Sequence, residues 1–73
     1  MTGAEFIEKI ELLGKRRKVQ VLFDARHGKG SHGRLYYGDM FTTVKDRKKD
    51  IGPGLLISML EDLGLTKSDI RGI

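Results

Sequence analysis

The first apolar stripe of the chain has helical spacing and consists of Phe6, Ile7, Ile10 and Leu13. Thr2 and Glu5 have the Thr-x-x-Glu spacing of a capping box, which marks a helix N-terminus. Gly14 follows the stripe and is a typical residue for ending a helix. The pattern predicts an amphipathic helix over residues 3–13.

Alternation of apolar and polar residues then predicts three strands. The apolar positions of the first two are Val19, Val21, Phe23, Leu35 and Tyr37. Residues 24–31 between them are rich in turn formers and predict a loop. Gly38 and Asp39 predict a tight hairpin turn into a third strand from Met40 to Val44, so the second and third strands are antiparallel neighbours.

A second apolar stripe follows a wholly charged loop over residues 45–50 and consists of Leu56, Met59, Leu60 and Leu63. Pro53 suits the first position of a helix, because its missing N–H would have no partner there. Gly64 is expected to end this helix. Thr66 and Asp69 are expected to cap a final short turn, with Ile70 packing back.

The element order is helix, three strands, helix, which predicts an α+β fold with a three-stranded antiparallel sheet. Both helices are expected on one face of the sheet, with the other face open. Because side chains alternate along a strand, Leu35 and Tyr37 are placed against the helices. His32, Arg34 and Tyr36 are placed on the open face.

Length and composition agree with one small domain, residues 1–73. The chain has no cysteine, so disulfides and thiolate zinc sites are excluded and a reducing compartment is favoured. The first residues do not have the pattern of a signal peptide, and no apolar run is long enough to span a membrane. We expect a cytoplasmic protein.

The net charge of +4 is unevenly distributed. Residues 15–50 hold eleven Lys and Arg against four Asp, a net of +7, while the two ends are slightly acidic. A basic centre favours phosphate-rich partners. A solvated surface that keeps the protein in solution is an equally good explanation of the charge alone.

The two histidines are the first candidates for acid–base chemistry, because imidazole titrates near neutral pH. Their spacing, without cysteine, does not suggest a metal site, and we expect neither a metal nor a cofactor. His27 is most simply a loop histidine. His32 stands near Lys29, Arg34 and Tyr36, which together would suit phosphodiester cleavage: a base for the 2′-hydroxyl, cations for the developing charge, and an aromatic ring for an unpaired base. The simpler alternative is a half-exposed strand histidine.

Two further features bear on phosphate binding. The residues Gly28–Ser31 lack the full P-loop pattern and precede a strand, so a nucleotide-binding loop is rejected. A basic cluster ahead of the second helix is a candidate phosphate anchor and consists of Lys45, Arg47, Lys48 and Lys49. A solvated charged loop is the alternative at comparable odds.

The chain resembles the HicA family of toxins in Gly30-Ser31-His32, in Arg34-Leu35-Tyr36, in the hairpin, and in the second-helix segment 54–60. The first helix, ending at Leu12-Leu13-Gly14, is also similar. The resemblance implies a fold like that of double-stranded-RNA-binding domains. It covers most of the chain.

The resemblance implies the toxin of a type II toxin–antitoxin system, an mRNA-cleaving endoribonuclease that acts without metal and is inhibited by a HicB-like antitoxin. It implies that His32 is the catalytic residue and that Gly30 and Ser31 belong to its motif. The expected RNA-binding residues are Lys29, Gly30, Ser31, Arg34, Tyr36, Lys45, Arg47, Lys48 and Lys49. The alternatives are a non-catalytic RNA-binding module and, with less support, a domain that docks an acidic protein.

Overall fold

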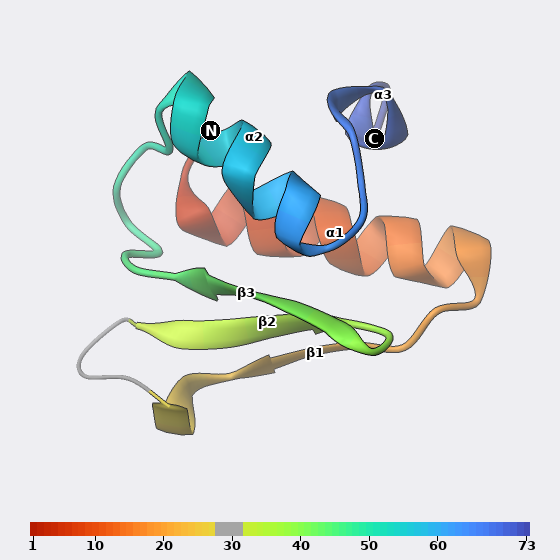
Figure 1. The fold of residues 1–73 in the computed structure, drawn as a ribbon, viewed down its shortest axis with the longest axis horizontal. Coiled ribbons are helices and arrows are strands. Elements are labelled where there is room, and N and C mark those ends of the chain that lie inside the picture. The colour runs from red at the N-terminus through yellow and green to blue at the C-terminus, as the bar shows by residue number, and fades with distance from the viewer. Residues whose placement is uncertain (28–31) are drawn as a thin grey trace.

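The element order predicted from the pattern is confirmed by a computed structural model, which describes residues 1–27 and 32–73. The elements are α1 (Gly3–Arg17), β1 (Val21–Asp24), a 3-10 turn (Ala25–His27), β2 (Gly33–Tyr37), β3 (Met40–Val44), α2 (Pro53–Asp62) and α3 (Lys67–Ile70). Figure 1 shows the helices gathered on one side of the three strands. No helix among the described residues is long and apolar enough to cross a membrane.

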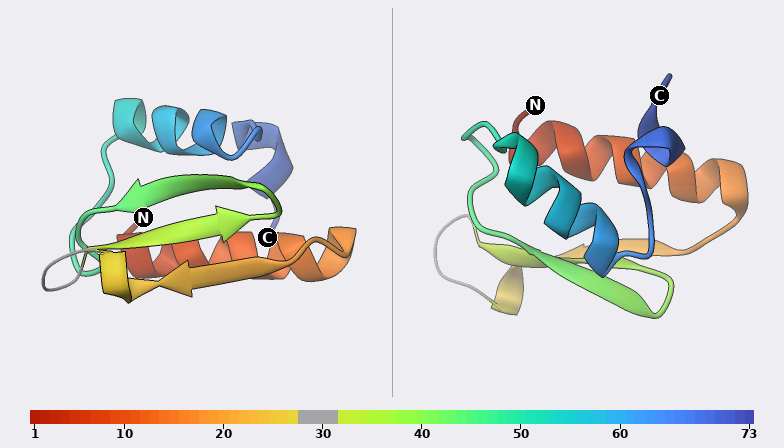
Figure 2. Two further views of the ribbon diagram at one scale, coloured as in Figure 1. Left: turned by 60° about the horizontal axis from the view of Figure 1, so that its bottom comes forward. Right: turned by 45° about the horizontal axis from the view of Figure 1, so that its top comes forward.

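The three strands form one antiparallel sheet in the order β1-β2-β3. α1 lies against β1 and β2, and α2 lies against β3. In the left view of Figure 2 the strands lie in front of α1, so one face of the sheet is free of helices. The predicted α+β architecture, with both long helices on one face, is therefore confirmed.

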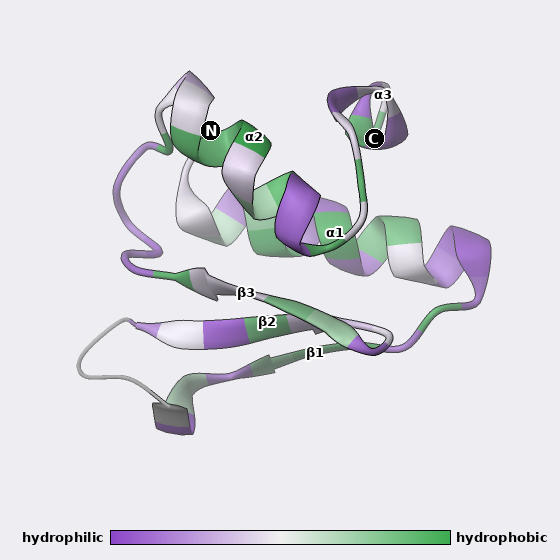
Figure 3. Cartoon of the chain, viewed as in Figure 1, coloured by the Kyte–Doolittle hydropathy of each residue, from purple (hydrophilic) through white to green (hydrophobic). Residues whose placement is uncertain are grey.

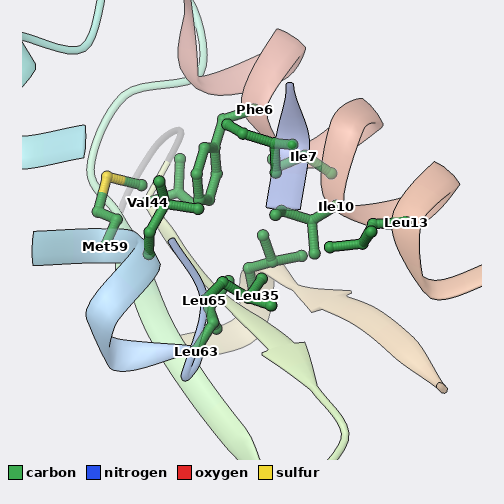
Figure 4. Packing of buried hydrophobic residues seen from close by; sticks show 11 residues of the cluster. Phe6, Ile7, Ile10, Leu13, Leu35, Val44, Met59, Leu63 and Leu65 are labelled. Atoms are coloured by element: carbon green, nitrogen blue, oxygen red, sulfur yellow. The ribbon is translucent and has the colours of Figure 1, made fainter. Parts of the chain in front are cut away.

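The hydrophobic core fills the space between the helices and the covered face of the sheet (Figure 4). Its buried members are Phe6, Ile7, Ile10, Leu13, Leu35, Val44, Met59, Leu60, Leu63, Leu65 and Ile70. Both predicted stripes contribute, although Leu56 is only half-buried. Leu35 lies at the centre with no exposed surface, and Tyr37 packs against the same cluster, as the alternation predicts.

The predicted end of the first helix is wrong, because α1 continues to Arg17. Gly14 lies inside the helix and is buried where α1 meets β1. A Cβ on Gly14 would lie 2.4 Å from Cγ2 of Val21. The helix ends instead at Lys18, whose φ of 58° is left-handed.

Two strand starts also differ from the prediction. The backbone N–H of Val19 donates to the carbonyl of Gly14 at 2.9 Å, so Val19 closes the helix and β1 begins at Val21. β2 begins at Gly33, which leaves His32 just outside the ladder. The predicted hairpin is confirmed, and Gly38 adopts the positive φ of 61° that such a turn requires.

The second half of the chain follows the pattern closely. α2 begins at Pro53, and the chain turns at Gly64. The N–H of Thr66 donates to the Asp69 carboxylate at 2.8 Å, which caps the short α3. Ile70 then packs back onto the core.

Candidate nucleic-acid interface

His32, the candidate catalytic residue, immediately precedes β2 and is exposed to solvent. Gly33 pairs with Val44, so the neighbours of these two residues, His32 and Lys45, lie at the same end of the sheet. No hydrogen bond joins the His32 imidazole to another residue of the described ranges. The predicted contributors Lys29, Gly30 and Ser31 lie outside the described residues.

Arg34 and Tyr36 follow along β2, and their side chains alternate with the buried Leu35. Both are half-buried and belong to the open face. The guanidinium carbon of Arg34 lies 4.7 Å from the centre of the Phe41 ring. The Tyr36 and Phe41 rings are 5.6 Å apart and inclined by 43°. The side chains of Arg34 and Tyr36 therefore both lie beside the Phe41 ring.

Phe41 was not predicted as a site residue, because the sequence pattern was not used to assign the side chains of the third strand to a face of the sheet. Phe41 is 43% exposed, whereas the polar Thr42 beside it is 2% exposed. Thr42 tolerates burial because its hydroxyl donates to the Asp62 carboxylate of α2 at 2.8 Å. Strand alternation from the buried Val44 was the available signal, since it places Thr42 inward and Phe41 outward.

Leu22 is the second residue that the prediction missed. It is 53% exposed and pairs with Tyr36, which in turn pairs with Phe41. These three side chains, here called the apolar row, cross all three strands on the open face. The departure of Leu22 from strict alternation in the sequence was its only sign.

A carboxylate lies beside the predicted cations. Asp24, at the end of β1, is 8% exposed and pairs across the sheet with Arg34. Its carboxylate accepts from the backbone N–H of Arg26 at 2.9 Å and from Nε and Nη2 of Arg26 at 3.0 Å each. The hydrogen bonds from the Arg26 side chain to Asp24 raise the pKa of Arg26, and the charge of Asp24 acts in the same direction.

The ion pair holds Arg26 at the rim of the open face. Its side chain is 86% exposed, although the bidentate contact fixes its guanidinium. Asp24 and Tyr36 also line an open depression on this face, together with Gln20, Leu22 and Gly38. The open face thus combines an apolar row with cations that are held in defined positions.

The basic loop is fastened to α1 rather than projecting freely. The backbone N–H groups of Gly3 and Ala4 donate to the carbonyls of Lys49 and Arg47, at 3.2 and 2.9 Å. The Arg47 guanidinium lies 5.1 Å from the centre of the Phe23 ring. This loop therefore satisfies the first N–H groups of α1, which a helix cannot satisfy by itself.

The predicted cations consequently divide into two groups. Arg34 belongs to the open face, whereas Arg47 covers Phe23, a side chain packed against the core. Lys45, Lys48 and Lys49 are exposed. Figure 3 shows the hydrophilic connection between β3 and α2 and a second hydrophilic segment in the last turn of α1.

Comparison of the chain with protein-family models, with curated proteins and with solved structures returned no match. The resemblance to the HicA family therefore stays a prediction.

Proposed function

We propose that this protein is a metal-independent endoribonuclease, the toxin of a toxin–antitoxin pair, in which His32 performs the acid–base chemistry. The observation that carries the proposal is the exposed His32 immediately before β2, followed by Arg34 and Tyr36 on the open face. His32 is two residues from Arg34, which is the spacing that puts two side chains on one side of an extended chain. Cytoplasmic location belongs to the same proposal.

The proposed reaction is transfer of the RNA phosphodiester to its own 2′-hydroxyl. His32 accepts the 2′-hydroxyl proton while that oxygen attacks phosphorus and the bond to the 5′-oxygen breaks. The departing 5′-oxygen takes a proton from water or from a second acid. The products are a 2′,3′-cyclic phosphate and a 5′-hydroxyl end.

Cations contribute by stabilising the negative charge that develops on the phosphoryl oxygens. Arg34 is the described cation nearest to His32 along β2 and already has a defined position over Phe41. Lys45 lies at the same end of the sheet and is exposed. Both side chains carry a positive charge, which would attract the phosphate groups of RNA.

The direct test is incubation of the parent, His32→Ala and His32→Gln proteins with end-labelled single-stranded RNA in EDTA, followed on a denaturing gel. We expect the parent to cleave and both variants to lose roughly 10²- to 10⁴-fold in rate. Because His32 is exposed, both variants should melt close to the parent temperature. Cleavage by His32→Ala at the parental rate would remove His32 from the chemistry.

A non-catalytic RNA-binding module is the second candidate. It is favoured by one observation: no side chain of the described residues orients the His32 imidazole by a hydrogen bond, as a base in an activated pair requires. The same gel decides between the two. Binding of RNA by the parent without any cleavage in EDTA would support the module.

A HicB-like antitoxin is the proposed protein partner, and this proposal rests on the family resemblance. We expect it to cover the open face, to shield His32 and to present acidic or backbone groups to Arg34. A partner that binds only the folded chain raises its melting temperature. An unchanged melting temperature with excess partner would count against this interface.

A further inference from the structure

The apolar row is unusual for a sheet face that no helix covers. Leu22 and Phe41 are 53% and 43% exposed, and both are paired with Tyr36 at the centre of the sheet. Contiguous exposed apolar side chains on a small protein commonly mark a binding surface. Two of these three side chains are aromatic.

The two rings have polar and charged neighbours that suit nucleotides. Arg34 lies over one side of Phe41 at 4.7 Å, and Tyr36 lies 5.6 Å from Phe41. An aromatic face stacks on any unpaired base, and an arginine beside it can bind the adjoining phosphate. The arrangement therefore offers ring contacts and charge contacts side by side.

A row of charged and polar residues runs parallel to the apolar row. Across the strands, Asp24 pairs with Arg34 and Arg34 pairs with Thr43. Asp24 also holds Arg26 by two side-chain contacts of 3.0 Å, which leaves the outer edge of that guanidinium in solvent. This row lies between the apolar row and His32 along β2.

We propose that the open face binds single-stranded RNA, with unpaired bases stacked on Tyr36 and Phe41 and the backbone running past Arg34 and Arg26 toward His32. That the ligand is RNA rests on the proposed function. The further inference is that the RNA is single-stranded and that its bases bind on these two rings. Phe41 and Arg26 are new assignments. Bases inside a duplex are stacked on one another and do not reach these rings.

Charge complementarity selects this occupant over an apolar protein surface. On the open face the two cations Arg26 and Arg34 stand against the one carboxylate of Asp24, within a stretch, residues 15–50, that has a net charge of +7. Arg26 and Arg34 flank the rings on the side toward His32. A polyanion with flat apolar bases matches both features at once.

The binding experiment uses the His32→Ala protein in EDTA, so that the RNA stays intact. We measure the Kd for a labelled single-stranded oligoribonucleotide by anisotropy. Loss of one base stack weakens binding by about 5- to 150-fold, and we expect Phe41→Ala and Tyr36→Ala each to lie in that range. Leu12→Ala is the matched control, because Leu12 is a comparably exposed apolar residue on α1.

Two further variants separate loss of the aromatic ring from loss of apolar area. Phe41→Tyr keeps the ring and should keep the parental Kd, whereas Phe41→Leu keeps much of the apolar area and should bind as weakly as Phe41→Ala. The unlabelled single strand should displace the probe at far lower concentration than the same sequence in a duplex. Equal competition by the duplex, or a parental Kd for Phe41→Leu, would overturn the proposal and leave the apolar row to a protein partner.

Tyrosine fluorescence gives an independent measure of stacking. The chain has no tryptophan and two tyrosines, so Tyr37→Phe in the His32→Ala protein leaves Tyr36 as the sole emitter. We expect single-stranded RNA to quench this emission with the same Kd as in the anisotropy experiment. Saturable RNA binding without quenching would contradict stacking on Tyr36.

The outcome is independent of the cleavage test. If the parent does not cut RNA but the ring variants bind weakly, the endonuclease proposal fails and the single-strand site stands. If His32 is required for cleavage but the ring variants bind normally, the endonuclease stands and the single-strand site fails.

Discussion

At the scale of single residues, Gly14 shows how one glycine in the sequence can have two interpretations. Glycine after an apolar stripe usually ends a helix, because it adopts a left-handed conformation without a steric penalty. Here its significance is the missing Cβ, since Val21 and the carbonyl of Val19 lie too close for one. The position of β1 against the helix decides between the two interpretations, and the residues next to Gly14 in the sequence do not reveal that position.

We predict that Gly14→Ala lowers the free energy of unfolding by up to about 2 kcal/mol. Alanine improves helix propensity by roughly 1 kcal/mol, but the added Cβ would lie 2.4 Å from Val21 Cγ2 and 2.8 Å from the Val19 carbonyl oxygen. Overpacking of this kind costs about 1–3 kcal/mol, and the backbone oxygen has little freedom to move. Urea denaturation measures the change.

Gly54→Ala is the matched control, because Gly54 also lies in a helix but a Cβ there meets nothing within 4 Å. We expect it to leave stability unchanged or to raise it by up to about 1 kcal/mol. Equal effects of the two substitutions would show that the contact with Val21 carries no cost.

At the scale of elements, α1 begins where its sequence signal predicts it. The N–H of Thr2 donates to Oε1 of Glu5 at 2.8 Å, and the N–H of Glu5 donates to Oγ1 of Thr2 at 3.2 Å. The hydrogen bond from the Thr2 backbone is the main cause that lowers the pKa of Glu5. The N–H groups of Gly3 and Ala4 donate to carbonyls of the basic loop. The start of this helix is therefore stabilised both by neighbouring residues and by a loop that is distant in the sequence.

We predict that Thr2→Ala lowers the free energy of unfolding by about 1 kcal/mol, because the N–H of Glu5 loses its acceptor. Thr2→Ser keeps the hydroxyl and should stay close to the parent. Chemical denaturation of the three proteins at neutral pH provides the comparison. A Thr2→Ala protein as stable as Thr2→Ser would mean that the loop alone supports the helix start.

At the scale of the whole molecule, the C-terminal turn is tied back to the end of α1. Arg17 Nη2 donates to Oδ1 of Asp69 at 2.6 Å, and Asp69 also caps α3 through Thr66. The contact with Arg17 is the main cause that lowers the pKa of Asp69 below its ordinary value of 3.8. The same contact raises the pKa of Arg17.

The lowered pKa predicts acid sensitivity. A carboxylate with a lowered pKa in the folded state contributes stability that is fully present above its ordinary pKa and is lost as the pH falls through the folded value. We therefore expect Asp69→Asn to lower the melting temperature at pH 7, and the difference from the parent to shrink as the pH falls below the ordinary pKa of 3.8. Glu5 also has a lowered pKa, so the variant keeps part of the acid dependence.

Arg17→Gln supplies the control for this ion pair. If the pair acts as a unit, the double variant Arg17→Gln, Asp69→Asn should be less destabilised than the sum of the single variants. Additive losses would assign the effect to the capping of α3 by Asp69 and not to Arg17. The measurement is the melting temperature of the four proteins at pH 7.

The sequence by itself determined the elements and their order, because helical spacing and strand alternation express the geometry of a few neighbouring residues. It also predicted that Arg34 and Tyr36 lie opposite the buried Leu35. The tertiary structure alone decided the end of α1 at Lys18, the pairing of the buried Thr42 with Asp62, and the fixed position of the basic loop on α1. Most of these features depend on partners distant along the chain, such as Asp62 for Thr42 and Gly3 for the loop, and the local pattern of residues does not identify such partners.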